Sequence, residues 1–202
     1  MIRHVLLDAD GVMQHLPGGW VAALEEHVGA DAEEFLRAAS EDERACLRGE
    51  GDFLAVLARH LEARGVAVTA DALHRAVWRS VHVEPSSVAL VHALRDAGLR
   101  VHLGTNQEGH RASYMRTELA YDDLFDESFY SCELGAAKPD AAFFTAVLDS
   151  LGAAAPEVLF VDDSEPNVVA ARECGLAAEH WRIDDGIDTL RGRLGAHGLS
   201  LT

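Results

Sequence analysis

Short apolar runs alternate with amphipathic segments along much of the chain. The apolar runs at residues 4–7, 99–104, 158–161 and, more weakly, 177–181 predict buried strands. Helical periodicity fills the segments 88–97, 140–151 and 166–175, which end at or next to Gly98, Gly152 and Gly175. Strands that alternate with helices are typical of a parallel sheet, so we expect an α/β fold with a Rossmann-like parallel sheet flanked by helices. Ligands bind such sheets at the carboxyl ends of the strands.

One long stretch breaks this alternation. Between about residues 16 and 84 the helical period continues without a convincing strand. The predicted helices there are 21–28, a segment from Asp31, a helix opened by the capping-box-like Ser40-Glu41-Asp42-Glu43, a helix after Asp52, and 69–81. Pro17-Gly18-Gly19 and Glu84-Pro85-Ser86-Ser87 read as its two linkers. We therefore expect an α/β core of residues 1–15 and 85–202 and a small all-helical cap of residues 16–84.

Composition limits the partners of the protein. An apolar content of 49% over 202 residues is enough for a sizeable core. The net charge of −17, from 34 acidic and 17 basic residues, argues against nucleic acid but leaves room for a small phosphorylated metabolite in a locally positive pocket. No apolar run approaches the roughly 18 residues of a membrane span, and no signal-peptide pattern follows Met1. Three unpaired cysteines fit a reducing compartment, so we expect a cytoplasmic protein; the sequence does not define its oligomeric state.

Polar clusters stand at the ends of three predicted strands and at one helix entry. They are Asp8-Ala9-Asp10-Gly11, Gly104-Thr105-Asn106-Gln107, the segment 135–140 with Lys138, and Asp162-Asp163-Ser164. Taken singly, each also fits a structural role as a turn, a helix cap or a surface corner. In a parallel sheet, however, the ends of neighbouring strands converge. The four clusters together therefore predict one crevice with four carboxylates, a hydroxyl and an ammonium group.

The charges of this crevice indicate a metal ion. Clustered carboxylates repel one another by several kcal/mol at intermediate dielectric unless a cation lies among them. Mg²⁺ prefers oxygen ligands and typically shares its coordination shell with a substrate phosphate. Lys138 can neutralise a phosphate oxygen or a carboxylate nucleophile, and Thr105 offers a hydroxyl to a phosphate.

These four motifs, in this order, resemble those of the haloacid dehalogenase-like (HAD) superfamily: DxDG, a strand-terminal Ser or Thr, a Lys and an acidic pair. The similarity covers residues 2–11 and roughly 88–181, where FVDDSEPNVVAARECGL and LGAAKPDAAFF are similar to members with a small helical cap between the first two motifs. Met13-Gln14-His15 departs from the Leu or aromatic residue that often follows the first motif.

The resemblance implies a role for each matching residue. Asp8 would be the nucleophile that takes the phosphoryl group, and Asp10 the general acid and then the general base. Thr105, Asn106 and Lys138 would bind the transferred phosphoryl group. Mg²⁺ would be held by the Asp8 carboxylate, the Asp10 backbone carbonyl and Asp163, with Asp162 in the outer shell, although the sequence leaves open which of the two neighbours touches the metal.

Asp10 also helps to distinguish two reactions. Dehalogenases of this superfamily have a motif that resembles DxYG, with a tyrosine in place of Asp10, because the halide that they expel needs no proton. A phosphatase must protonate the leaving alcohol, so Asp10 favours a phosphatase. We therefore expect a Mg²⁺-dependent phosphatase that hydrolyses a small phosphomonoester, such as a sugar phosphate. The resemblance implies that the cap closes over the crevice, excludes water and sets specificity. His15, Trp20 and Arg44 could face the substrate, but surface or packing roles are the expectation for them.

Three other functions remain open from the sequence. A receiver-type signalling domain uses similar groups, but there the acidic pair comes first and the lysine last. A phosphomutase on the same fold would pass the phosphoryl group to a second hydroxyl. A non-catalytic phosphate-binding protein could keep the fold without the reaction, although all four motifs retain their reactive groups here.

Overall fold

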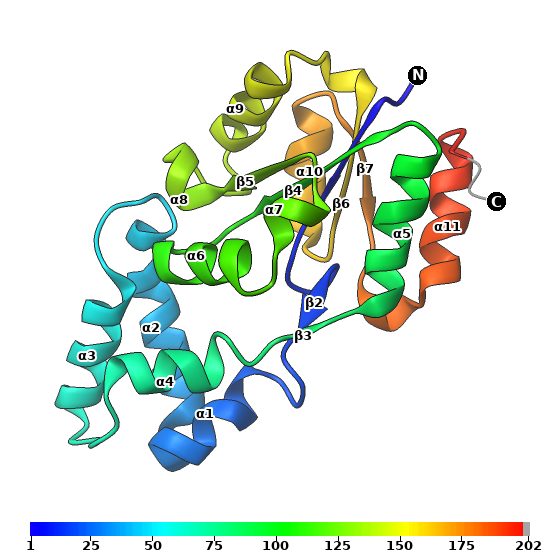
Figure 1. Cartoon of the computed structure of the whole chain (residues 1–202). Helices are drawn as coiled ribbons and strands as arrows, with labels where there is room; N and C mark the ends of the chain where they lie inside the picture. The colour runs from blue at the N-terminus through cyan, green and yellow to red at the C-terminus, as the bar shows by residue number, and fades with distance from the viewer. Residues whose placement is uncertain (200–202) are drawn as a thin grey trace.

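The computed structural model describes residues 1–199 as alternating strands and helices around a central sheet (Figure 1). The strands are β1 (His4–Leu7), β2 (Gln14–His15), β3 (His82–Val83), β4 (Arg100–Thr105), β5 (Glu127–Tyr130), β6 (Val158–Asp162) and β7 (Ala177–His180). The α-helices are α1 (Trp20–Val28), α2 (Ala32–Cys46), α3 (Phe53–Ala63), α4 (Ala70–Val77), α5 (Pro85–Asp96), α6 (Gly109–Thr117), α7 (Tyr121–Leu124), α8 (Ser131–Leu134), α9 (Ala141–Leu151), α10 (Glu165–Glu173) and α11 (Ile187–Ala196). Short 3₁₀ helices are η1 (Gly29–Asp31), η2 (Ala155–Glu157) and η3 (Ile183–Asp185).

Five of the strands form one parallel sheet in the order β5-β4-β1-β6-β7. The fold class is therefore confirmed, and the four predicted strands are present with ends displaced by at most one residue. β5 was not predicted. β1 lies at the centre, and its register places Leu7 opposite both Leu103 and Val161. The residues that follow these three positions therefore meet at one edge of the sheet.

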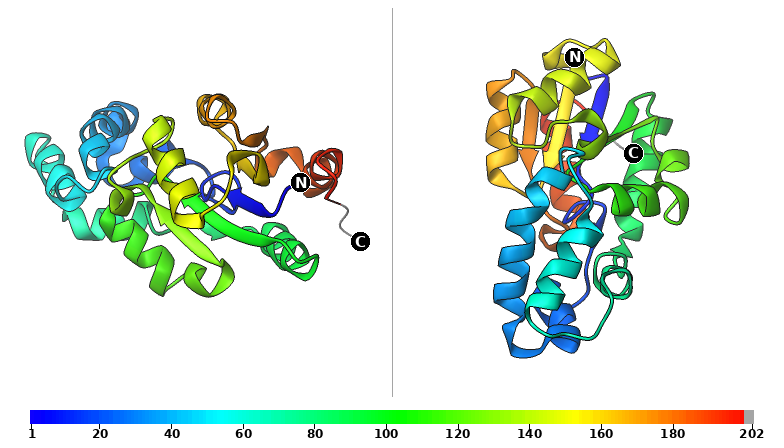
Figure 2. Two further views of the ribbon diagram at one scale, coloured as in Figure 1. Left: turned by 90° about the horizontal axis from the view of Figure 1, so that it is seen from above. Right: turned by 90° about the vertical axis from the view of Figure 1, so that its left-hand side faces the viewer.

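Helices cover both faces of the sheet (Figure 2). Successive side chains of a strand point to opposite faces, so Val5 and Leu7 pack with one buried cluster and Leu6 with the other. The first cluster includes residues of α5, α6, α7 and α11, and the second includes residues of α9 and α10. Burial on both faces accounts for the continuous apolar character of β1 and β6.

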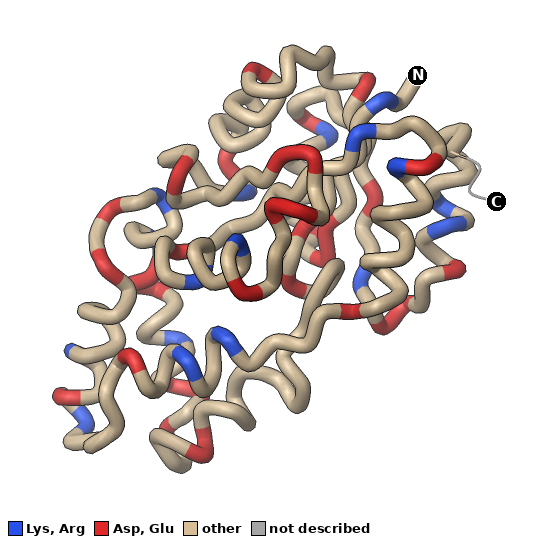
Figure 3. The backbone as a smooth tube through the Cα atoms, viewed as in Figure 1, with Lys and Arg blue, Asp and Glu red and all other residues tan. Residues whose placement is uncertain are grey.

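Helices α1–α4 form a separate helical insertion, residues 16–81, at the end of the molecule where the sheet strands have their carboxyl ends (Figures 1 and 2). The insertion has its own apolar cluster, which includes Leu24, Phe35, Leu57 and Leu73. β2 leads into it and β3 leads out, and the two pair as an antiparallel ribbon. Acidic and basic positions are spread along the backbone of both the insertion and the sheet unit (Figure 3).

Two local predictions are wrong. Ser40-Glu41-Asp42-Glu43 does not open a helix, because α2 already begins at Ala32 and Phe35 and Ala39 continue its buried face through this stretch. Residues 84–87 are not a linker but the N-cap and first turn of α5. The Glu84 side chain accepts a hydrogen bond from the Ser86 backbone N–H, and proline in the first turn favours helix entry. α4 also ends earlier than predicted, at Val77.

Candidate active site

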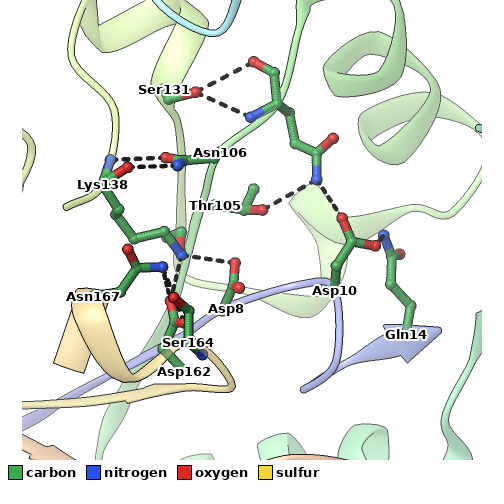
Figure 4. Close-up of polar contacts among 12 residues, drawn as sticks. Asp8, Asp10, Gln14, Thr105, Asn106, Ser131, Lys138, Asp162, Ser164 and Asn167 are labelled. Carbon is green, nitrogen blue, oxygen red and sulfur yellow. Dashed lines mark hydrogen bonds and ion pairs between the residues drawn. The ribbon is translucent and has the colours of Figure 1, made fainter. Parts of the chain in front are cut away.

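A buried lysine joins the ends of three strands. The Nζ atom of Lys138 lies 2.8 Å from Asp8 Oδ1 and 2.7 Å from Asp162 Oδ2, and it donates to the Gly104 carbonyl at 2.8 Å (Figure 4). Asp8 directly follows β1, Asp162 is the last residue of β6, and Gly104 lies in β4. Burial would lower the pKa of Lys138, but the charges of Asp8 and Asp162 outweigh it and raise that pKa. The lysine is therefore a fixed positive charge beside the Asp8 carboxylate.

Asn106 holds this lysine in place. Its Nδ2 donates to the Lys138 carbonyl at 2.8 Å, and its Oδ1 accepts from the Lys138 backbone N–H at 2.8 Å (Figure 4). The two bonds imitate a backbone pairing between the loop after β4 and the segment before α9. Asn106, expected from the resemblance to bind phosphate, thus uses its amide group on the lysine backbone in this arrangement.

Asp8, Asp162 and Asp163 each offer a carboxylate oxygen, and these oxygens lie within 4.8 Å of one another. Burial raises the pKa of Asp8 to about 7 against the opposing charge of Lys138, and burial together with the charge of Asp162 raises the pKa of Asp163. Three carboxylates facing one ammonium leave an excess of negative charge. A hard divalent cation with oxygen ligands, such as Mg²⁺, fits this donor set.

The two neighbouring aspartates differ in what they contact. Asp162 is fully buried, and its oxygens accept from Lys138, from the Ser164 backbone N–H at 2.8 Å and from Asn167 Nδ2 at 3.0 and 3.1 Å. Within residues 1–199, no hydrogen-bond donor reaches the Asp163 carboxylate. Asp163 therefore keeps its oxygens available for a ligand, whereas those of Asp162 are engaged by the protein.

Gly11 permits the close approach of Asp163 to the loop after β1. Its φ of +80° is in the left-handed region, and a Cβ atom at this position would overlap the Asp163 carboxylate. The glycine of the first motif is thus required by both the backbone angle and the space.

Asp10 is held by residues from other elements. Arg111 of α6 donates two bonds of 2.7 Å, one to each carboxylate oxygen, and Gln14 and Gln107 add bonds of 3.0 and 2.9 Å. Burial would raise the pKa of Asp10. The charge and hydrogen bonds of Arg111, together with the hydrogen bonds from Gln14 and Gln107, outweigh this effect and lower that pKa. The carboxylate is therefore ionised and oriented in this state.

Sequence reasoning missed Arg111, which connects Asp10 to the helical insertion. Its Nε donates to the Trp78 carbonyl at 2.8 Å, and its guanidinium lies 5.1 Å from the centre of the Trp20 ring. The signal in the sequence was its position, because Arg111 is the first Lys or Arg after the second motif. Gln14, which the sequence left without a role, is fully buried and is oriented by the Tyr121 hydroxyl at 2.8 Å.

The remaining predicted residues lie around one crevice of about 380 Å³. Its lining includes Asp8, Asp10, Thr105, Asn106, Lys138 and Asp163, while Asp162 lies beneath it. Thr105 Oγ1 accepts from Gln107 at 3.2 Å. His15 and Trp20 also line the crevice, whereas Arg44 lines a neighbouring groove.

The insertion contacts the sheet unit at α6 as well as through the β2–β3 ribbon. The side chains of His74 and Glu108 are both buried and lie 2.9 Å apart, and the Tyr114 hydroxyl donates to the Arg79 carbonyl at 2.8 Å.

With this geometry in place, comparison with known proteins identifies the family. A family model described as haloacid dehalogenase-like hydrolase matches residues 2–175. A phosphoglycolate phosphatase of Rhodospirillum rubrum is 32% identical over 193 residues, covering 87% of this chain and 78% of the relative. The chain belongs to the haloacid dehalogenase-like hydrolase family, as the motifs indicated, and it is a hydrolase.

Other relatives agree with this assignment. A sesquiterpene phosphatase of Aspergillus oryzae is 37% identical over 93 residues, which span 46% of this chain and 47%, about half, of that protein. Among solved structures, a HAD family enzyme of Bacteroides thetaiotaomicron in complex with magnesium and inorganic phosphate has a TM-score of 0.80 at 22% identity, covering 94% of this chain and 99% of that one. L-2-haloacid dehalogenase from Xanthobacter autotrophicus shares the fold at a TM-score of 0.68 and 21% identity, covering 98% and 84%. Over the part of the chain that the structure describes, we find no helix with the length and apolarity to cross a membrane.

Proposed function

We propose that the protein is a Mg²⁺-dependent phosphatase that hydrolyses a small phosphomonoester, a sugar phosphate or similar metabolite, through an aspartyl phosphate on Asp8. The observation that carries this proposal is the arrangement around Lys138: its ammonium group contacts Asp8 and Asp162, while the Asp163 carboxylate beside them accepts no hydrogen bond from residues 1–199. A nucleophile, a fixed cation and available oxygen ligands thus share one crevice. The phosphatases among the relatives support this reaction class.

In the first step, an Asp8 oxygen attacks phosphorus and the ester P–O bond breaks. Asp10 gives its proton to the leaving alcohol, which departs neutral. In the second step, water attacks the phosphorus of the aspartyl phosphate and gives a proton to Asp10. The bond between phosphorus and the Asp8 oxygen breaks, inorganic phosphate leaves, and Asp8 is regenerated. Lys138 would give a phosphoryl oxygen the N–H that now faces Asp8, and the Thr105 hydroxyl would donate to another phosphoryl oxygen.

The Asp8 and Asp163 carboxylates and the Asp10 backbone carbonyl would hold Mg²⁺, with Asp162 in the outer shell. When bound, this ion would neutralise charge on the phosphoryl oxygens and orient the group for in-line displacement. Asp162 would keep Lys138 in position through their 2.7 Å contact.

The proton-carrying role of Asp10 requires a change from the state described here. Both of its oxygens accept hydrogen bonds from Arg111 and a glutamine. Asp10 therefore has to give up at least one of these bonds before it carries a proton to the leaving group. Arg111 would fix the direction of the carboxylate between the two transfers.

We propose that residues 16–84, which are the helical insertion with β3 and Glu84 after it, form a cap over a catalytic core of residues 1–15 and 85–202. Trp20 of α1 lines the crevice, which supports a role of the insertion in enclosing the substrate. Closing an active site removes bulk water and strengthens the electrostatic contacts to the phosphoryl group.

A phosphatase screen over a panel of small phosphomonoesters with Mg²⁺ tests the proposal, with Asp8→Asn as the blank. We expect release of inorganic phosphate that requires both Mg²⁺ and Asp8. Equal release by Asp8→Asn would refute the nucleophile, and an isomeric phosphate formed from glucose 1-phosphate without free phosphate would show a phosphomutase.

A further inference from the structure

A second cavity adjoins the catalytic crevice. It measures about 270 Å³ and shares Asp10, Trp20 and Asn106 with the crevice. It extends between α2 and the residue after α4 of the insertion and α6 of the sheet unit, where its lining includes Leu36, Trp78 and Arg111. Because Asp10 would donate a proton to the leaving oxygen, a cavity that begins at Asp10 lies where the leaving alcohol would extend.

Most of the walls of this cavity are apolar or already hydrogen-bonded. Trp20 and Trp78 lie with ring centres 6.1 Å apart, and Leu36 and Leu47 add aliphatic surface. Arg111 is the only cation among the residues that line it, and its guanidinium is bonded to Asp10, Gln107 and the Trp78 carbonyl. Two oxygens of an incoming carboxylate would find no matching pair of free N–H groups there.

Glu43 of α2 is the acidic side chain of the insertion that lines the cavity, and within residues 1–199 its carboxyl makes no hydrogen bond or ion pair. Burial raises the pKa of Glu43 to about 8, with the charges of Glu108 and Asp10 adding to this and that of Arg111 opposing it. At neutral pH the carboxyl is therefore mainly protonated, and it can both donate and accept a hydrogen bond. Ser40, one turn earlier on α2, also lines the cavity.

We propose that this cavity holds the leaving alcohol and that Glu43 binds a hydroxyl group on it. The substrates are then phosphomonoesters of uncharged alcohols that present an apolar face to the tryptophans and a second hydroxyl to Glu43, and not of alcohols that carry a carboxylate. A carboxylate would lose its hydration beside Asp10 and Glu43 and would find no free cation to replace it. A hydroxyl can donate a hydrogen bond to the Glu43 carboxyl or accept one from it. This inference rests on the proposed phosphatase function.

Three benzyl phosphates test it, because they differ only at the far end of the leaving group: 4-(hydroxymethyl)benzyl, 4-methylbenzyl and 4-carboxybenzyl phosphate. We expect the wild-type kcat/KM to be about 3- to 10-fold higher for the hydroxymethyl than for the methyl compound, as one hydrogen bond provides. The carboxylate compound should be at least about 10-fold poorer than the hydroxymethyl compound. Hydrolysis of phenyl phosphate, a phosphomonoester whose leaving group carries no distal hydroxyl, reports on the proposed function separately.

Glu43→Leu should bring the hydroxymethyl-to-methyl ratio to about 1, and Glu43→Gln should retain most of it. Glu34→Leu, at an exposed position of the same helix, should keep the wild-type ratio. Because the ratio is taken within each variant, a lower folded fraction cancels. A wild-type preference for the carboxylate, or a ratio that Glu43→Leu leaves unchanged, would overturn the inference while phenyl phosphate hydrolysis upheld the phosphatase. If the wild type released phosphate from none of the benzyl and phenyl phosphates, both would fall.

Discussion

Arg111 and Asp10 form a bidentate ion pair, in which two guanidinium nitrogens each lie 2.7 Å from a different carboxylate oxygen. The arginine is buried, comes from α6, and lies 101 residues from its partner. Parallel bonds of this kind fix the plane of a carboxylate as well as its distance. The expected proton carrier of the site is thus oriented by a residue outside the four motifs.

Arg111→Ala should lower kcat for a phosphomonoester by at least about 10-fold, because Asp10 loses the group that directs its carboxylate toward the leaving oxygen. Arg111→Lys should be intermediate, since an ammonium group cannot make two parallel bonds. Steady-state kinetics on the refolded and purified variants measure this. Arg116→Ala on the same helix, which removes surface contacts to Asp122 and Glu133, is the matched control and should keep near-wild-type kcat. A wild-type kcat for Arg111→Ala would contradict the positioning role.

Asp162→Asn and Asp163→Asn should separate structure from metal binding. Asp162→Asn leaves Lys138 with Asp8 as its one buried carboxylate and weakens the hydrogen bonds that Asp162 accepts, so we expect a loss of about 1–3 kcal/mol in the free energy of unfolding. The raised pKa of Asp163 means that its ionised form is disfavoured in the folded protein, so Asp163→Asn should unfold at the same or a higher temperature without metal. Its Mg²⁺ affinity, measured by titration calorimetry, should fall at least about 10-fold. The reverse pattern would exchange the two assignments.

Gly11→Ala should impair the site more than its backbone angle alone explains. Gly18 provides the comparison, because its φ is +77° against +80° for Gly11, yet no heavy atom of residues 1–199 outside its immediate chain neighbours lies within 4 Å of a Cβ placed there. Gly18→Ala should therefore cost only the strain of a left-handed residue, about 1–2 kcal/mol. Gly11→Ala should in addition displace Asp163 and reduce Mg²⁺-dependent turnover by about 100-fold. If both variants kept the same turnover, the close approach would be of no consequence for the reaction.

His102 should make the fold less stable in acid. Burial, with the charges of His4 and Arg100, lowers its pKa from 6.5 to about 4. Below pH 6.5 the unfolded chain takes up a proton that the folded chain does not, so this contribution to stability is present at pH 7 and is lost progressively as the pH falls toward 4. We expect a loss of about 2 kcal/mol between pH 7 and pH 5 from this residue.

Urea unfolding of His102→Gln at the two pH values measures that loss. The difference between pH 7 and pH 5 should be smaller by about 2 kcal/mol than in the wild type. His92→Gln, at an exposed position of α5, should retain the wild-type difference. An unchanged difference in His102→Gln would assign the acid sensitivity to other groups.

The sequence predicted what depends on local pattern. β1 and β6 are apolar runs buried on both faces, so their position and the polar residues after them could be read directly. β5 was missed because it is an edge strand of four residues, Glu127–Tyr130, whose first two side chains are only half-buried. The prediction that a helix begins at Ser40 was wrong because the capping-box pattern lies inside α2, whose buried face already includes Phe35 and Ala39.

Contacts between distant segments could not be predicted in the same way. The motifs named Lys138 and Asn106 as neighbours of a phosphate, but their pairing through the lysine backbone depends on how two loops meet. The ion pair of Arg111 with Asp10 depends on where α6 begins after β4. The place of Glu43 in a cavity could be recognised only from the fold, which brings residues of α2 and α6 into one lining. For such residues the sequence shows the chemistry but not the partner.

The helical insertion is joined to the sheet unit by the β2–β3 ribbon and by the contacts of Glu108, Arg111 and Tyr114 with residues 74–79. The ion pair of Arg48 with Asp140, before α9, and the contact of His110 with Asp52, at the start of α6, also join the two units. A rotation of the insertion about the ribbon therefore has to break the bond from Arg111 to the Trp78 carbonyl and separate the buried His74 and Glu108 side chains. The same arginine orients Asp10. An opening of the insertion at this contact would therefore also release one of the bonds that hold Arg111 against Asp10.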